Sequence, residues 1–257
     1  MPSWDPEVYA RYKVYRDRPA LDLLLQIPDD LKPREIWDLG CGAGEQAALL
    51  AARHPQARTF GLDSSAEMLA MARGRASKVR WIEGDLDQWS PPAPVDLIYS
   101  NSVLQWLPDH DQLFPRLAAA LAPDGVLACQ MSQSFDQSWH VALRDLAAEP
   151  AWAAQLEGVQ ALRHVARPEA YFDWLSATCG EIDIWTTTYL HVLEGDDPVV
   201  DWMSGSGLRP YLDALPDKAQ RAQFLEAYRA RLAEVLPPRA DGQTLFPVPR
   251  LFIIARR

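Results

Sequence analysis

Residues 36–45 are Ile36-Trp37-Asp38-Leu39-Gly40-Cys41-Gly42-Ala43-Gly44-Glu45, an apolar run that leads into three alternating glycines and then into a helix-forming segment. Glycine adopts backbone angles that other residues avoid, and it lets main-chain amides approach a ligand without a Cβ in between. The apolar run, the turn and the helical segment therefore predict a loop that binds a nucleotide cofactor.

The spacing of this loop narrows the kind of cofactor. Its glycines follow G-x-G-x-G, and Glu45 stands where the dinucleotide pattern G-x-G-x-x-G needs glycine. Asp38, just before the loop, would repel a phosphate but attract a cation or an ammonium group. We therefore expect S-adenosyl-L-methionine as the cofactor, because it carries a sulfonium and an amino acid group, and S-adenosyl-L-homocysteine as its product.

Short apolar runs alternate with helical patterns after this loop. We expect strands at 36–39, 59–62, 79–82, 97–100 and 126–130, and helices at 45–53, 66–75 and 112–121. This alternation predicts an α/β, Rossmann-like fold, in which helices cover both faces of a mostly parallel sheet and ligands bind at the carboxyl ends of its strands. We expect one domain over 1–257: a helical cover at 1–30, a cofactor-binding core at 31–133, a helical segment at 134–178 and a helical insert or lid at 195–246.

Composition limits the class of protein further. The chain has 257 residues and a formal net charge of −10, so it lacks the basic face that nucleic acids and anionic membranes require, and we expect neither as a partner. Residues 1–5 show no signal-peptide pattern and no apolar run approaches membrane-spanning length, which indicates a cytoplasmic protein. Cys41, Cys129 and Cys179 lack paired spacing, so we expect reduced, packed thiols and no metal site.

Side chains at the ends of the predicted strands are candidates for the cofactor site, with Asp38 and the three glycines. Asp63 ends the second strand about twenty residues after the loop, where a carboxylate accepts both ribose hydroxyls of an adenosine; alternatively it caps the next helix. Asp85, followed by Leu86, could accept the adenine amino group or form a turn. Met68 could pack on the adenine or in the core, and Asn101 lies at the mouth of the same crevice or caps a turn.

These residues resemble the S-adenosylmethionine-dependent methyltransferases built on a seven-stranded sheet, whose cofactor loop is D-x-G-x-G-x-G. Further segments narrow the resemblance to the trans-aconitate 2-methyltransferase family: 4–6 with Tyr9, 18–20, NSVLQWLPDH at 101–110, 126–128, 183–189, 201–202, GLRP at 207–210 and 249–253. The resemblance implies methyl transfer from S-adenosylmethionine to a carboxylate of trans-aconitate, a small polycarboxylate, to give a monomethyl ester. Residues 134–167 contain no motif that adds to this resemblance.

The residues are compatible with this chemistry. Methyl transfer from a sulfonium is an in-line displacement, and a carboxylate nucleophile is already ionised at neutral pH, so we expect orientation of the reactants and no catalytic general base. Arginine binds carboxylates bidentately, which makes Arg18, Arg209 and Arg250 candidate clamps for the acceptor. A solvated or salt-bridged role is the alternative for each, and Arg209, in the expected insert, ranks first.

Aromatic and histidine side chains complete the candidate sites. Trp4 and Tyr9 could fold over the cofactor or belong to a helix packed on the domain. Trp106 follows the fourth strand, where the acceptor should lie, or fills the core. Three further side chains could donate hydrogen bonds to acceptor carboxylates, with a structural role as the alternative: His140, Tyr189 and Trp202.

Two other classes of protein stay open at this point. A nicotinamide-dependent reductase also has glycines after its first strand, and Tyr9-x-x-x-Lys13 matches its tyrosine–lysine pair. That pair follows the fourth or fifth strand in reductases but precedes the glycine loop here. A non-catalytic S-adenosylmethionine-binding protein would carry the same loop, but it would not need arginines for an acceptor.

A methyltransferase whose acceptor is a hydroxyl group would need a base such as His140 or Tyr189. The sequence predicts no oligomeric state.

Overall fold

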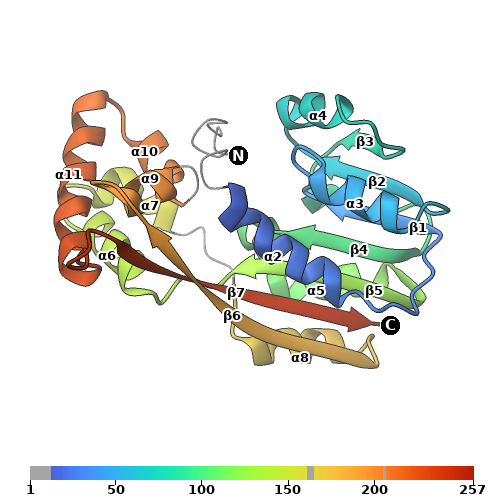
Figure 1. The fold of residues 1–257 in the computed structure, drawn as a ribbon. Helices are drawn as coiled ribbons and strands as arrows, with labels where there is room; N and C mark the ends of the chain where they lie inside the picture. Colours follow the sequence, from blue (N-terminus) through green and yellow to red (C-terminus); the bar gives the residue numbers. More distant parts are fainter. Residues whose placement is uncertain (1–12, 161–164, 205–206) are drawn as a thin grey trace. The chain divides into compact units, whose positions relative to one another are not determined.

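The computed structural model describes residues 13–160, 165–204 and 207–257, which belong to two compact units (Figure 1). Of the described residues, the sheet unit comprises 18–132, 165–187 and 250–257, and the helical unit comprises 13–17, 133–160, 188–204 and 207–249. Each unit has a hydrophobic core of its own. The expected organisation into one domain stays a prediction.

The described residues form a seven-stranded sheet in the order β3-β2-β1-β4-β5-β7-β6, which confirms the predicted α/β fold class (Figure 1). β1 to β5 run parallel to one another, and β7 runs antiparallel to β5. The strand order reverses at β1, which lies between β2 and β4, and ligands bind at such switch points. The strands are β1 Glu35–Leu39, β2 Arg58–Asp63, β3 Arg80–Glu83, β4 Val95–Asn101, β5 Leu121–Ser132, β6 Glu181–Leu193 and β7 Thr244–Arg256.

The helices of the sheet unit lie close to their predicted positions. They include α3 Glu45–Arg53, α4 Ala66–Arg73 and α5 His110–Ala119. The expected end of α4 at residue 75 is wrong because Gly74 ends that helix. The expected end of α5 at residue 121 is also wrong, because Leu121 instead begins β5 and pairs with Val95 ahead of a shift in register.

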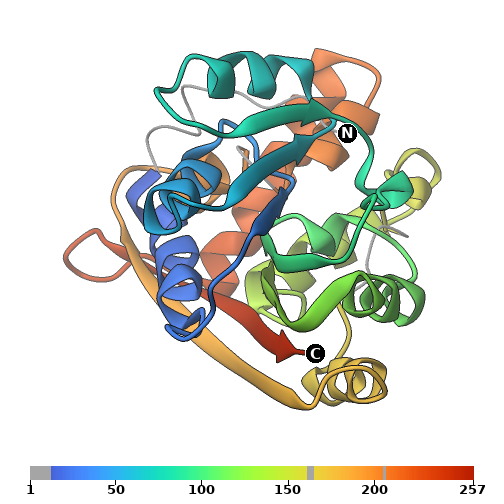
Figure 2. The same cartoon turned by 90° about the vertical axis from the view of Figure 1, so that its right-hand side faces the viewer.

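Helices cover both faces of the sheet. One face carries Asp38, Gly61 and Tyr99, since the parallel register places these residues side by side on β1, β2 and β4. The Tyr99 hydroxyl donates to the Ala20 carbonyl of α2 (Lys13–Gln26) at 3.0 Å, so α2 lies over this face. Helices α5 and α8 (Pro168–Ser176) cover the opposite face, and Figure 2 shows blue α2 and green α5 on opposite sides of the strands.

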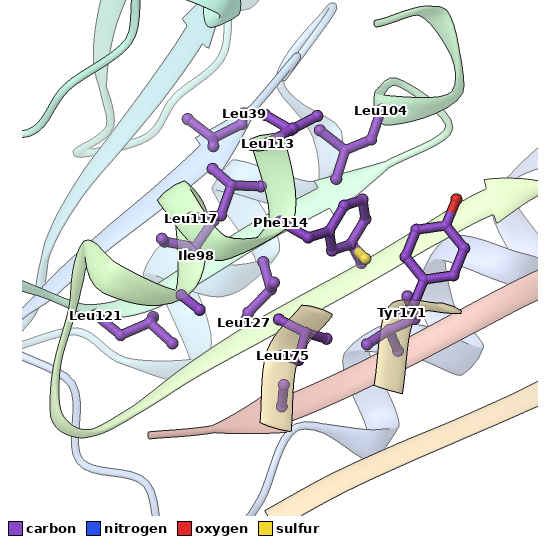
Figure 3. Close-up of a cluster of buried hydrophobic side chains, with 14 of the residues drawn as sticks. Leu39, Ile98, Leu104, Leu113, Phe114, Leu117, Leu121, Leu127, Tyr171 and Leu175 are labelled. Atoms are coloured by element: carbon purple, nitrogen blue, oxygen red, sulfur yellow. The ribbon is translucent and has the colours of Figure 1, made fainter. Parts of the chain in front are cut away.

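The core of the sheet unit lies between the sheet and the helices α5 and α8. Figure 3 shows Ile98 and Leu127 of the strands facing Phe114 of α5, with Tyr171 and Leu175 of α8 beside them. Each of these side chains is fully buried, and burying one side chain of this size contributes about 1.5–3 kcal/mol. The predicted packing of the three cysteines is also confirmed, because Cys41, Cys129 and Cys179 are buried.

A buried hydrogen-bond chain connects α8 to the loop after β4. The backbone N–H of Ala166 donates to the Tyr171 hydroxyl at 3.0 Å, and that hydroxyl lies 2.7 Å from His110 Nδ1. His110 Nε2 lies 2.8 Å from the carbonyl oxygen of Leu104, which can only accept, so Nε2 carries the proton and Nδ1 of the neutral ring accepts from Tyr171. Burial raises the pKa of the Tyr171 phenol, which keeps it protonated as this donor.

The Tyr171→Phe variant is expected to have a free energy of unfolding about 2–3 kcal/mol lower than the wild type, since it leaves His110 Nδ1 and the Ala166 N–H without their present partner. Urea denaturation measures the change. Replacing the neighbouring exposed Phe172 with leucine is the control and should stay within about 0.5 kcal/mol. An equally small effect at Tyr171 would show that this chain of hydrogen bonds does not stabilise the fold.

The helical unit contains α6, α7, α9, α10 and α11, together with the parts of β6 and β7 outside the sheet unit. Its core packs Trp139 against Phe246, with ring centroids 4.7 Å apart, and the Tyr228 hydroxyl donates to the Trp139 carbonyl at 3.0 Å. The expected helical segments at 134–178 and 195–246 therefore contain helices, but a lid function for the second stays a prediction. The bounds are α6 Ser138–Ala147, α7 Ala153–Gln160, α9 Pro198–Ser204, α10 Arg209–Ala214 and α11 Lys218–Val235.

Candidate functional site

The glycine loop follows β1 at the switch point and leads into α3. Gly40, Gly42 and Gly44 all have positive φ, at 77°, 52° and 82°. A Cβ on Gly40 would lie 2.3 Å from Val103, and a Cβ on Gly44 would lie 2.4 Å from the ring of Trp81. Packing within the protein therefore requires the first and third glycines. All three have the backbone angles expected of them, and the approach of a ligand to this loop stays a prediction.

Asp63 holds the glycine loop to the end of β2. Its Oδ2 accepts from the backbone N–H of Gly42 at 2.8 Å, and its Oδ1 accepts from the N–H of Ser65 at 2.9 Å. The alternative role predicted for Asp63, a helix cap, is wrong because the Ser65 side chain caps α4. Each carboxylate oxygen keeps a second lone pair, so the predicted bonds to ribose hydroxyls are compatible with this geometry and stay a prediction.

Asp38 is a buried acid at the start of the same loop, with only 2% of its surface exposed. Its Oδ2 has no hydrogen-bond partner among the residues that the structure describes. Burial, reinforced by the negative charge of Asp63, raises the pKa of Asp38 to about 8, although a backbone hydrogen bond from Ala47 opposes the shift. A buried carboxylate with an unused oxygen suits a cationic ligand, so this position fits the ammonium or sulfonium of S-adenosylmethionine.

The other cofactor candidates lie around this loop or outside the described residues. The Met68 methyl carbon is 3.2 Å from where a Cβ on Gly42 would be, which places this side chain against the loop. Asp85 is exposed and accepts from the Asp87 N–H at 3.0 Å, so it forms the turn given as its alternative. Leu86 is buried in the core of the sheet unit. Trp4 and Tyr9 lie outside the described residues, and none of these cofactor contacts is tested.

Polar side chains also gather where β4, β5 and β7 meet. Asn101 pairs in register with Gln130, and Ser132 pairs with Arg250, which places all four on the same face of the sheet as Asp38. Asn101 Oδ1 and Gln130 Nε2 are buried without a hydrogen-bond partner in the described parts of the chain. Arg250 is 7% exposed, so its setting is that of a buried cation and not the solvated alternative.

Gln130 was not among the predicted site residues. It follows the apolar run 126–129, so the rule that selected Asp63, Asp85 and Asn101, a polar residue at the end of a strand, also applies to it. Gln130 ends the predicted strand 126–130, whereas the observed strand continues to Ser132.

Arg18 and Trp106 are the remaining candidates in the sheet unit. The Arg18 side chain is 74% exposed and lies 3.9 Å from Asp22, one turn along α2, so the structure shows the salt-bridged alternative. Trp106 is half-buried in a short helix, η2 Leu104–Trp106, which His110 holds through Leu104.

The helical unit contains the other four acceptor candidates. Arg209 begins α10, and its Nε lies 3.2 Å from Asp213 Oδ1. Tyr189 and Trp202 are 5% exposed, and His140 stacks on Trp139 with ring centroids 5.3 Å apart. These positions are compatible with the structural alternatives, and binding of an acceptor by any of the four stays a prediction.

Comparison with known proteins identifies the class. Residues 36–125 match the family model of a methyltransferase domain, which spans the glycine loop and β1 to β4. The solved structure of phosphoethanolamine N-methyltransferase 2 from Haemonchus contortus with S-adenosyl-L-methionine has a similar fold: 93% of this chain covers 52% of that one, with a TM-score of 0.53 and 18% identity. Residues 36–125 thus form a methyltransferase domain, and the chain shares the fold of that solved structure.

Two curated relatives then identify the family. A trans-aconitate 2-methyltransferase of Azoarcus sp. (strain BH72) is 45% identical, and each protein covers 100% of the other. A second, from Methylobacterium nodulans, is 46% identical, and the alignment covers 100% of this chain and 99% of the relative. This chain therefore belongs to the trans-aconitate 2-methyltransferase family, as the sequence motifs predict. In the part of the chain that is described, the structure has no helix long and apolar enough to span a bilayer.

The affinity for S-adenosylmethionine is expected to rise with pH up to about 8. Only the ionised form of Asp38 attracts a cation, and its pKa of about 8 means that this form becomes about tenfold rarer for each pH unit below that value. Calorimetric titration at pH 6, 7 and 8, in buffers of different ionisation enthalpy, measures both the affinity and the proton released on binding. A pH-independent Kd without proton release would contradict this role of Asp38.

Proposed function

We propose that this protein transfers the methyl group of S-adenosylmethionine to a carboxylate of trans-aconitate, giving a monomethyl ester and S-adenosylhomocysteine. The proposal rests on two buried ionisable side chains on one face of the sheet, one acidic and one basic. Asp38 lies at the end of β1 and suits a cation, whereas Arg250 lies on β7 and suits an anion. The names of the full-length relatives support the choice of trans-aconitate.

Asp38, Asp63 and the glycine loop would hold the cofactor. Asp38 offers a negative charge to the amino acid and sulfonium end, and Asp63, fixed by Gly42 and Ser65, offers acceptor lone pairs to the ribose. When bound, the cofactor supplies an electrophilic methyl group whose leaving group is a neutral thioether. Because Asp63 is already fixed by two backbone amides, it needs little rearrangement to bind.

The protein's contribution to the chemical step is orientation of the acceptor. A carboxylate is ionised at neutral pH and needs no proton removed, so a base is not required. The buried Arg250 guanidinium can donate two parallel hydrogen bonds to a carboxylate and thereby fix its direction. Alignment of the reacting oxygen with the methyl group removes much of the entropic barrier.

Methyl transfer to a panel of acceptors tests this function. The purified protein is incubated with methyl-labelled S-adenosylmethionine and with trans-aconitate, cis-aconitate, citrate, crotonate, a phenol or an amine. We expect the highest kcat/KM for trans-aconitate and no transfer to the phenol or the amine. Transfer to the phenol but not to trans-aconitate would overturn the proposal, and cofactor binding without transfer to any acceptor would favour a non-catalytic binding protein.

Arg209 is expected to bind the acceptor and not the cofactor. The Arg209→Ala variant should raise the KM for trans-aconitate about tenfold, because one charge-assisted hydrogen bond is lost. The Kd of S-adenosylmethionine should stay within about twofold of the wild-type value. Asp213→Asn is the matched control, because it removes the ion pair with Arg209 but keeps the cation. Equal changes in both variants, or an equal loss of cofactor affinity in Arg209→Ala, would contradict an acceptor role.

A further inference from the structure

Ser102 has a left-handed backbone conformation immediately after β4, with φ of 59°. Residues other than glycine rarely adopt this conformation, and it is held here by two hydrogen bonds. The Ser102 N–H donates to the Gln130 carbonyl at 2.9 Å, and Gln105 Nε2 donates to the Ser102 carbonyl at 2.8 Å. Strained backbone that its surroundings maintain in this way is concentrated at functional sites.

The Ser102 hydroxyl connects two buried side chains from neighbouring strands. It accepts from Arg250 Nη1 at 3.3 Å and donates to Gln130 Oε1 at 2.9 Å. Because the guanidinium can only donate, the hydroxyl proton is left for an acceptor, and this turns the oxygen of the Gln130 amide toward Ser102. The strained turn thus sets the direction of the Gln130 amide and contacts the Arg250 head group.

The amide nitrogen of Gln130 is the unusual atom of this cluster. Gln130 is 0% exposed, and its Nε2 has no hydrogen-bond partner in the described ranges of the chain. Buried amide donors are normally satisfied, so an unpaired one beside a buried guanidinium points to a ligand with several acceptor atoms. Both groups are donors, and a carboxylate provides the acceptor oxygens and the negative charge that suit them together.

The cluster is also set apart from Asp38, the candidate for the amino acid end of the cofactor. Gln130 lies on β5 and Arg250 on β7, which are two and three strands away from Asp38 on β1. Neighbouring strands are about 4.8 Å apart, so Arg250 begins about 14 Å from the strand of Asp38. This distance favours a contact with the acceptor over a contact with the amino acid end of the cofactor.

We propose that Gln130 and Arg250 bind a carboxylate of the acceptor that is not methylated, and that Ser102 is the positioning residue for both. The inference rests on the proposed function and makes it more specific. A polycarboxylate would be selected over a monocarboxylate because only the former has a second carboxylate for this site.

Two variants test the inference with little change in side-chain size. Gln130→Glu keeps an acceptor for the Ser102 hydroxyl but replaces the amide donor with a negative charge, which repels a carboxylate. Ser102→Gly removes the hydroxyl at a position whose positive φ suits glycine, so the fold should be kept. In each variant, the ratio of kcat/KM for trans-aconitate to that for crotonate should fall at least tenfold, with the Kd of S-adenosylmethionine within twofold of the wild type.

Gln112→Glu, on the exposed surface of α5, is the matched control and should leave the ratio unchanged. A structural role alone would lower kcat/KM for both acceptors by the same factor and reduce Tm, and that result, or an unchanged ratio, would overturn the inference. Calorimetric titration of tricarballylate into the complex with S-adenosylhomocysteine separates the two proposals. If the wild type binds tricarballylate and Gln130→Glu weakens this binding at least tenfold, the site is supported even if the methylated acceptor differs from trans-aconitate. If the wild type and Gln130→Glu bind tricarballylate equally well, the site is overturned and the proposed function still stands.

Discussion

Replacement of Asp38 with asparagine is expected to weaken S-adenosylmethionine binding at least a hundredfold, on the order of 3 kcal/mol, while it stabilises the ligand-free protein. The carboxylate is 2% exposed, and its Oδ2 is unpaired among the described residues, so a neutral amide is easier to bury. The same substitution removes the negative charge that attracts the cofactor. Stability and binding should therefore change in opposite directions.

The stability gain of Asp38→Asn should increase as the pH rises. The folded protein keeps the Asp38 proton up to a pKa of about 8, whereas the unfolded chain releases it near 3.8. Between these values the folded state binds more protons, so the free energy of unfolding of the wild type falls as pH rises. The advantage of Asp38→Asn should therefore be small near pH 4 and reach about 2–5 kcal/mol at pH 8.

Urea denaturation at pH 5 and pH 8, together with a cofactor titration, measures both effects of Asp38→Asn. The control is Asp173→Asn, which changes an exposed acid on α8 and should move neither quantity by more than about 0.5 kcal/mol. An asparagine variant that binds S-adenosylmethionine normally, or that is less stable than the wild type at pH 8, would contradict the assigned role.

The Gly44→Ala variant is expected to destabilise the fold by about 3 kcal/mol or more, which combines a left-handed backbone penalty with overpacking. Gly44 has φ of 82°, and a Cβ there would lie 2.4 Å from the ring of Trp81 and 3.1 Å from Ala72. The loop would have to move away from β3, and α3, which starts at Glu45, would move with it. Thermal or urea denaturation measures the loss.

Two comparisons separate the causes of this loss. Gly180→Ala is the matched control, because a Cβ at Gly180 meets no atom within 4 Å, and it should leave the stability nearly unchanged. Combining Gly44→Ala with Trp81→Leu should recover the overpacking part and leave only the backbone penalty of about 1–2 kcal/mol. If Gly44→Ala is as stable as the wild type, the loop is not held by its contact with Trp81.

The residues that follow the strands were predictable from the sequence because strand, glycine turn, helix and acid occur in a fixed order. That order gave the fold class, the crevice and the roles proposed for Asp38 and Asp63. The packing reason for Gly40 and Gly44 was not predictable, since Val103 and Trp81 contact the loop from distant positions in the sequence. The same holds for Ser102, whose backbone conformation depends on Gln105 and Gln130.

The arginines show a similar limit. Sequence alone gives no measure of burial, so Arg18, Arg209 and Arg250 differ only in their neighbours along the chain. The structure separates them, because Arg18 is exposed and paired with Asp22, Arg209 is paired with Asp213, and Arg250 is buried. This contrast makes Arg250 the best-supported clamp, although Arg209 ranks first from the sequence because it lies in the expected insert.

The chemical nature of the methylated product tests the central claim most directly. The wild-type protein is incubated with methyl-labelled S-adenosylmethionine and trans-aconitate, and the labelled product is isolated. Its mass is measured by mass spectrometry, and it is then treated with mild alkali. We predict a monomethyl ester, formed in equal amount with S-adenosylhomocysteine, from which alkali releases all of the label as methanol. Label that stays attached to the product in alkali, or the absence of any labelled acid, would contradict esterification of a carboxylate.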